Sequence, residues 1–124
     1  MNVKTTLILI LGGGLGALAR YYISGIFPVY RDFPLGTLLV NSLASFLLGY
    51  LYGLLFSGLD VSSEWRLFLG TGFCGGLSTF STFSYETFSL IREGELSIAM
   101  MNILANVLVT LTLVYLGFIL AIRR

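Results

Sequence analysis

The chain has 124 residues, of which 56% are hydrophobic and only 10% are charged, and its formal net charge is +1. A soluble domain of this size needs more polar residues to cover its surface, so the composition excludes one and indicates a membrane protein. With no histidine and with Cys74 as the only cysteine, an intramolecular disulfide is excluded, and histidine-based zinc, haem and triad chemistry lacks its ligand or base.

Four apolar runs divide the chain, and each exceeds the roughly 20 residues that a helix needs to cross a hydrocarbon core of about 30 Å. They extend over Thr5–Phe27, Leu35–Leu59, Trp65–Ile91 and Ser97–Ile122. The connections between them are short and contain most of the acidic residues and both prolines. The pattern predicts an all-α membrane protein whose single domain, residues 1–124, consists of four transmembrane helices.

Glycines in the first span invite two interpretations. The string "GGGLGA", residues 12–17, formally fits a dinucleotide-binding fingerprint. That fingerprint requires a preceding strand and a soluble βαβ unit, whereas this one lies inside an apolar run. Gly12 and Gly16 are better explained as a small-xxx-small pair, as are Gly49 and Gly53 in the second span, and such pairs predict close helix packing.

The basic residues are almost evenly divided between the two sides of the membrane. The side with both termini has Lys4, Arg66, Arg123 and Arg124, and the other side has Arg20, Arg31 and Arg92. Because orientation follows a Lys/Arg bias, a chain that nearly lacks one is expected to insert both ways and to pair as an antiparallel, dual-topology homodimer. The alternative is that one or two residues of bias are enough to fix one orientation.

Polar and small residues recur every four positions in two spans, and residues at this spacing share one helix face. The second span has Thr37, Asn41, Ser45, Gly49 and Gly53, and the fourth has Asn102, Asn106 and Thr110. Interhelical hydrogen bonding explains either stripe alone. Together with the third span, the two stripes could instead line a continuous polar track.

The third span contains "GTGFCGGLSTFSTFSYETF", residues 70–88, which is unusually polar for a membrane helix. Gly75 and Gly76 weaken a helix, and the Ser/Thr residues after them can bond freed backbone groups, so we expect a break at mid-span. Carbonyls exposed there need protein, water or a cation as partner. Beyond the break, helical periodicity gathers Phe80, Phe83 and Glu86 in one wedge of roughly 120° with Thr79 and Thr87. Ordinary core packing remains the simpler explanation of the two rings.

At these residues the chain resembles the Fluc (CrcB) fluoride channels, which are small four-span proteins that form antiparallel dual-topology dimers. The resemblance covers essentially the whole chain and is carried by "GGGLGALARY", "GTLLVN", "GFCGGLSTFSTFSYE" and the stripe of the fourth span. It implies that backbone carbonyls of Gly75 and Ser78 from both subunits hold a structural sodium ion on the dimer axis. The family more often has threonine at the position of Ser78, but a carbonyl contact tolerates serine.

The resemblance also implies a fluoride pathway, with Phe80 and Phe83 projecting into the pores, Asn41 hydrogen-bonding beside them and Arg20 at an aqueous vestibule. The residues expected along the pathway are Arg20, Thr37, Asn41, Phe80, Ser81, Thr82, Phe83, Glu86, Asn102, Asn106 and Thr110. Amides, hydroxyls and the positive edges of phenyl rings can all replace the water of a small anion. A base at mid-pore would trap the ion, and Arg20 and Arg92 both lie near span ends.

These observations predict a passive, fluoride-selective channel of a prokaryotic plasma (inner) membrane, which lowers fluoride toxicity in the cytoplasm. The partners expected are fluoride, the lipid bilayer and a second copy, and no nucleic acid. The alternatives are a four-span dual-topology exporter, whose family relies on a first-span carboxylate that is missing here, and an accessory membrane subunit. An enzyme with Ser78 or Ser81 as nucleophile is disfavoured, because "GLSTF" lacks the closing glycine of a nucleophile elbow.

Overall fold

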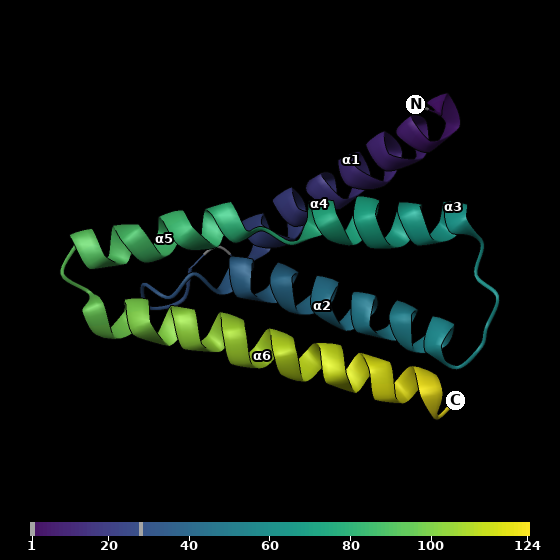
Figure 1. Cartoon of the computed structure of the whole chain (residues 1–124). Coiled ribbons are helices and arrows are strands. Elements are labelled where there is room, and N and C mark those ends of the chain that lie inside the picture. Colours follow the sequence, from purple (N-terminus) through teal and green to yellow (C-terminus); the bar gives the residue numbers. More distant parts are fainter. Residues whose placement is uncertain (1, 28) are drawn as a thin grey trace.

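A computed structural model describes residues 2–27 and 29–124, and every helix in it runs roughly along one long axis except α1, which crosses the others obliquely (Figure 1). The elements are α1 (Val3–Ile26), α2 (Leu35–Phe56), α3 (Ser63–Arg66), the π-helix η1 (Leu67–Cys74), α4 (Gly75–Leu77), α5 (Phe80–Arg92) and α6 (Leu96–Ile122). The long helices α1, α2 and α6 are long and apolar enough to cross a membrane. They coincide with the first, second and fourth predicted spans to within a few residues.

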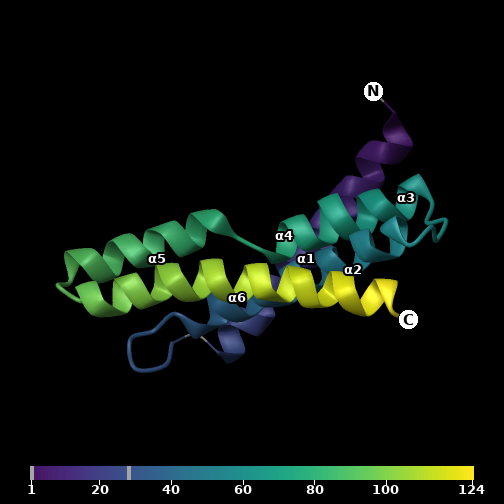
Figure 2. The same cartoon turned by 60° about the horizontal axis from the view of Figure 1, so that its bottom comes forward.

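The third predicted span consists of two helical pieces with a gap between them, and such a break was expected from the sequence. The elements α3, η1 and α4 form one continuous helical segment, and α5 follows after a gap at Ser78 and Thr79. Figure 2 shows the extended link between α4 and α5, with α5 lying along the first half of α6. We expected the break around Gly75, Gly76 and the Ser/Thr residues after them; the two glycines are helical, and the chain leaves the helix at Ser78.

Glycines determine how closely the helices approach. A Cβ atom at Gly16 would lie 2.2 Å from the Phe73 carbonyl oxygen, and one at Gly76 would lie 2.3 Å from the Gly13 carbonyl oxygen, so α1 touches η1 and α4 backbone to backbone. A Cβ atom at Gly49 would lie 2.2 Å from the Val114 carbonyl oxygen, between α2 and α6. The predicted role of the glycine pairs in close helix packing is confirmed.

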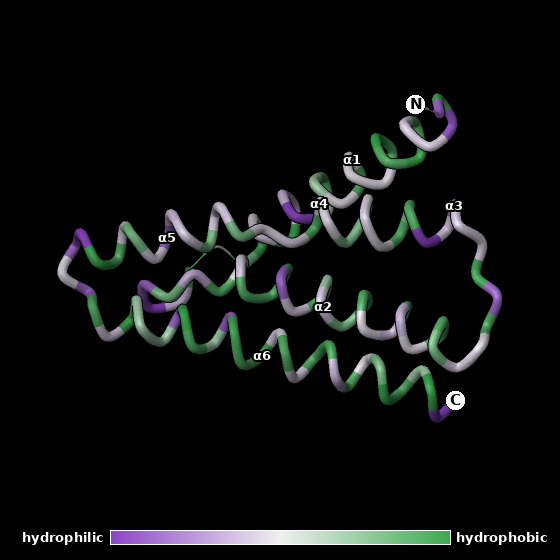
Figure 3. The backbone as a smooth tube through the Cα atoms, viewed as in Figure 1, coloured by the Kyte–Doolittle hydropathy of each residue, from purple (hydrophilic) through white to green (hydrophobic). Residues whose placement is uncertain are grey.

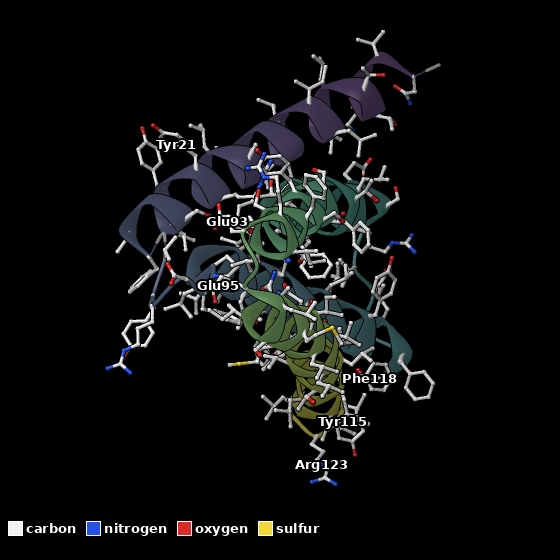
Figure 4. All side chains as sticks on the ribbon, turned by 90° about the vertical axis from the view of Figure 1, so that its left-hand side faces the viewer. Tyr21, Glu93, Glu95, Tyr115, Phe118 and Arg123 are labelled. Carbon is white, nitrogen blue, oxygen red and sulfur yellow. The ribbon has the colours of Figure 1, made fainter. Side chains whose placement is uncertain are left out.

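Short turns join the helices at both ends. Asn2 caps α1 by accepting a hydrogen bond from the Lys4 N–H at 2.9 Å. Gly94 has a φ of 82° and closes the two-helix turn between α5 and α6, where the Glu95 N–H donates to the Leu90 carbonyl at 2.8 Å. Figure 4, which faces that end of the molecule, shows Glu93 and Glu95 at this turn.

Apolar side chains cover most of the outer surface. Hydrophobic residues extend along the helices, most continuously in α6, and many of the hydrophilic residues lie at the connections and chain ends (Figure 3). Large apolar residues such as Leu7, Ile10, Leu108 and Leu111 are more than half exposed. Such a surface suits lipid or a second protein rather than water, and it fits a multi-pass membrane protein.

Candidate functional site

The gap between α4 and α5 is held open by one side chain from α2. Ser78 and Thr79 are extended, with ψ angles of 158° and 116°. The Thr79 N–H donates to Asn41 Oδ1 at 2.7 Å, and Asn41 Nδ2 donates back to the Thr79 carbonyl oxygen at 3.4 Å. The Asn41 amide thus pairs with both backbone groups of the residue that leaves the helix, which explains why the break falls here and not at the glycines.

Other groups freed by the gap are also bonded. Thr79 caps α5, because its Oγ1 accepts from the Thr82 N–H at 3.1 Å. The Ser78 hydroxyl donates to the Cys74 carbonyl at 2.9 Å, and Arg20 Nε donates to the Gly76 carbonyl at 3.0 Å. The carbonyls of Gly75, Leu77 and Ser78, in contrast, accept no hydrogen bond from any residue that the structure describes.

Three asparagines and a threonine form one hydrogen-bonded chain, which we call the asparagine network (Asn41, Asn106, Asn102 and Thr87). Its bonds are Asn41 Nδ2 to Asn106 Oδ1 at 3.0 Å, Asn106 Nδ2 to Asn102 Oδ1 at 2.9 Å, Asn102 Nδ2 to Thr87 Oγ1 at 2.9 Å, and Thr87 Oγ1 to the Phe83 carbonyl at 2.8 Å. All four side chains are buried. The network therefore links α2, α6 and α5, so the two predicted polar stripes do face each other and also bond the helices together.

One groove, which we call the phenylalanine groove, opens beside this network. It has a volume of about 430 Å³ and is lined by Asn41, Ser45, Ser78, Thr79, Phe80, Phe83, Asn106, Val107, Thr110 and Leu111. The centroids of the Phe80 and Phe83 rings lie 5.4 Å apart at an interplanar angle of 59°. Phe80 is 78% exposed whereas Phe83 is only 9% exposed, so the pair reaches from the protein interior to its surface.

A second groove, the arginine groove, lies on the other side of Thr79, which lines both. Its volume is about 620 Å³, and its polar lining consists of Arg20, Ser24, Thr37, Thr79, Thr82 and Glu86. The Oε1 atom of Glu86 is buried and has no hydrogen-bond partner among the described residues. This groove places a cation and a carboxylate close to the helix gap.

The structure separates some residues that the sequence analysis grouped together. Glu86 lines the arginine groove and not the phenylalanine groove, because it lies about 120° around α5 from Phe80. Ser81 is exposed on α5, and its hydroxyl lies 3.3 Å from that of Thr79. Asn102 is completely buried and lines neither groove.

Sequence reasoning missed one lining residue, Ser24, and one contact, that between Thr87 and Asn102. Ser24 lines the arginine groove, but it stands alone in the first span, so no spacing pattern singles it out. Thr87 was placed on the face of the rings, yet its bond to Asn102 depends on how α5 is rotated against α6, which the sequence does not specify.

The phenylalanine groove has a chemistry that favours weak contact with a small anion. No charged side chain lines it, and it offers hydroxyl groups and the edges of two phenyl rings. Fixed positive charge is therefore missing from its lining, which allows an ion to leave. Within residues 2–27 and 29–124, no cluster of three or more His, Cys, Asp or Glu side chains could hold a metal ion.

Comparison with known proteins identifies the family. The model of the family described as "CrcB-like protein, Camphor Resistance (CrcB)" matches residues 7–118. A Pyrococcus abyssi protein named "Fluoride-specific ion channel FluC" is 83% identical over 123 residues, which cover 99% of this chain and 100% of that protein. Proteins of the same name from Pyrococcus horikoshii and Methanocaldococcus jannaschii are 76% and 52% identical, over 99% and 97% of this chain and 100% and 96% of their own lengths. The chain belongs to the CrcB family.

Proposed function

We propose that this chain is a fluoride-selective passive channel that exports fluoride across the plasma membrane of a prokaryote and so lowers fluoride toxicity in the cytoplasm. The observation that carries the proposal is the 83% identity, over nearly the whole chain, to a protein named as a fluoride-specific ion channel. Such a protein moves an ion and catalyses no reaction, so its site residues act by contact and position.

The phenylalanine groove is the proposed fluoride pathway. A fluoride ion that loses water needs partial positive charge around it, and ring edges and hydroxyls supply that charge without a permanent cation. Phe80, Phe83 and Thr110 line this groove. Ser81 and Thr82 lie between the two rings in sequence, with Ser81 exposed on α5 and Thr82 in the lining of the arginine groove. Arg20, with Thr37 and Glu86, lines the adjoining arginine groove, which we assign as the aqueous vestibule.

The proposed working unit is an antiparallel homodimer. The phenylalanine groove is open along one side, and Phe80 at its rim is 78% exposed, so a second protein surface is needed to enclose an ion. A Cβ atom at Gly75 would meet no atom within 4 Å, which leaves room for another backbone beside the helix gap. The division of four basic residues against three supports insertion in both orientations.

We also propose a structural sodium ion at the contact between the two copies. The Gly75 and Ser78 carbonyls have no donor among the described residues, and oxygen atoms are the ligands that hard cations prefer. Two copies would contribute four such carbonyls around a symmetry axis. The ion supplies positive charge that compensates these carbonyl dipoles, while Asn41 and Arg20 hold the neighbouring backbone groups.

Purified protein in liposomes tests the function directly. Vesicles loaded with potassium fluoride or potassium chloride are diluted into an impermeant anion, valinomycin is added, and ion-selective electrodes follow the anion released. We expect rapid fluoride efflux and chloride efflux close to that of empty vesicles. Equal efflux of both anions would refute selectivity, and a lack of any efflux would favour an accessory role.

A further inference from the structure

The asparagine network has a fixed direction, because both of its ends are backbone groups. At one end the Thr79 N–H can only donate, and it donates to Asn41 at 2.7 Å. At the other end the Phe83 carbonyl can only accept, and it accepts from Thr87 at 2.8 Å. The amide groups between them are therefore held in a single orientation, with each NH₂ group pointing along the chain toward Thr87.

Two side-chain amides of the network, those of Asn41 and Asn106, have no free N–H hydrogen left to donate to another acceptor. Asn41 uses one amide hydrogen for Asn106 at 3.0 Å and the other for the Thr79 carbonyl at 3.4 Å. Asn106 donates to both Oδ1 and the carbonyl oxygen of Asn102, each at 2.9 Å. Although both residues line the phenylalanine groove, an ion in that groove would have to break a buried bond to reach either NH₂ group.

The same bonds hold α5 at two points on either side of the rings. Asn41 holds the backbone at Thr79, and Asn102 holds Thr87, two turns further along the helix. Phe80 and Phe83 lie between these points. Any rotation of α5 that moved the rings would therefore stretch bonds at both points.

We infer that Asn102 and Thr87 are positioning residues for the ion pathway, which act through the asparagine network to set the Phe80 and Phe83 rings. Asn41 then supports the helix gap with its amide and does not donate to fluoride. The donors left for the ion in the phenylalanine groove are hydroxyls, above all that of Ser45, which makes no hydrogen bond with any described residue. This inference rests on the proposed function, since it assigns roles within that pathway.

Thr87→Val tests the positioning role, because valine keeps the shape of threonine and removes the hydroxyl that receives the Asn102 amide. We expect fluoride efflux per reconstituted dimer to fall about tenfold, as loss of one buried hydrogen bond predicts. Thr87→Ser restores the hydroxyl and should recover most of the rate. Thr112→Val is the matched control, since the exposed Thr112 hydroxyl bonds the Leu108 carbonyl at 2.7 Å in the same way, outside the network, and its rate should stay at that of the wild type.

Side-chain amide resonances of ¹⁵N-labelled protein in lipid nanodiscs test the role of Asn41. Thr87→Val should shift the resonances of all three network asparagines together, whereas saturating sodium fluoride should leave that of Asn41 in place in the wild type. The fluoride titration needs no variant, so it decides the point even if the valine variant does not assemble.

The outcomes separate the two levels of the proposal. A fluoride-dependent shift of the Asn41 amide, or wild-type efflux in Thr87→Val, overturns this inference while the channel function stands. Loss of rate in Thr87→Ser as large as in Thr87→Val also overturns it, because any change at Thr87 would then be damaging. Absence of fluoride efflux from the wild type refutes the channel itself and the positioning role with it.

Discussion

The close backbone approach at Gly16, between α1 and the segment η1–α4, offers a sharp test of how the helices are held together. Gly16→Ala places a Cβ atom 2.2 Å from the Phe73 carbonyl oxygen and 2.8 Å from the Leu77 nitrogen. Since carbon and oxygen normally approach no closer than about 3.3 Å, α1 must move by about 1 Å. Both neighbours are backbone atoms, so no side chain can rotate to make space.

A second glycine of the same helix provides the control. A Cβ atom at Gly14 would meet no atom within 4 Å, so Gly14→Ala adds a methyl group without a clash. Both variants replace a helical glycine by alanine and gain the same helix propensity, which therefore cancels in the comparison. What remains is the cost of overpacking, and we expect Gly16→Ala to be less stable than Gly14→Ala by about 1–3 kcal/mol.

The assay is unfolding of the purified protein in mixed micelles as the fraction of denaturing detergent rises, followed by circular dichroism. Fluoride efflux of each variant is measured in parallel, and Gly14→Ala should keep the wild-type rate. Equal free energies of unfolding for the two variants would refute the packing of α1 against η1 and α4. So would a Gly14→Ala variant that is the less stable of the two.

Three further predictions concern the pathway and the assembly. Phe80→Ile and Phe83→Ile should each slow fluoride efflux strongly, because isoleucine keeps the bulk and loses the ring edge. Because Phe83 is buried, its replacement should lower the free energy of unfolding more than that of Phe80, by up to about 1.5 kcal/mol. Wild-type efflux rates in both variants would assign the rings to packing alone. Ser78→Ala should retain efflux and sodium-dependent dimer stability, since only the backbone carbonyl of Ser78 is proposed as a ligand. Gly75→Val should impair dimer formation, measured by size-exclusion chromatography, without a clash inside one copy. A Ser78→Ala variant that is dimeric but inactive would contradict the proposed site. Two arginines added beside Arg31 should bias most copies to one orientation and abolish efflux, with recovery on coexpression of an oppositely biased variant; full activity of the biased variant alone would argue for a parallel assembly.

Much of the fold could be predicted because the information is local to each span. A run of apolar residues long enough to cross the membrane must be helical, so α1, α2 and α6 were expected close to their observed bounds. Close packing at Gly16 and Gly49 was also expected, since small residues at this spacing have few other uses in a membrane helix.

The position of the gap could not be predicted from propensity alone. Gly75 and Gly76 are poor helix formers, yet they remain helical because Gly76 packs directly on α1 and the helix hydrogen bonds continue through Ser78 N–H to Cys74. The helix ends where Asn41, which is far away in sequence, can replace the lost bonds of Thr79. A contact between distant segments overrode the local preference.

The residues of the candidate site were predicted more successfully than their assignment to the two grooves. Asn41 was expected beside Phe80 and Phe83, and Asn106 on the polar stripe of the fourth span; both line the groove of the two rings. Glu86 was expected with the rings and lies in the other groove, because a wedge of about 120° on α5 is wide enough to face two different neighbours. Which neighbour each residue meets depends on the rotation of α5 against α2 and α6.

The self-contained hydrogen bonding of each copy has a consequence for how the protein is made. Because Asn41, Asn102 and Asn106 satisfy one another, a newly inserted chain leaves none of these costly amides exposed to lipid while it is still alone. In the antiparallel dimer proposed above, a lone copy would complete its own folding in whichever orientation it was inserted and diffuse in the bilayer until it met a copy of opposite orientation. Under that proposal, biogenesis would need no coordination between the synthesis of the two halves, and one gene would supply both.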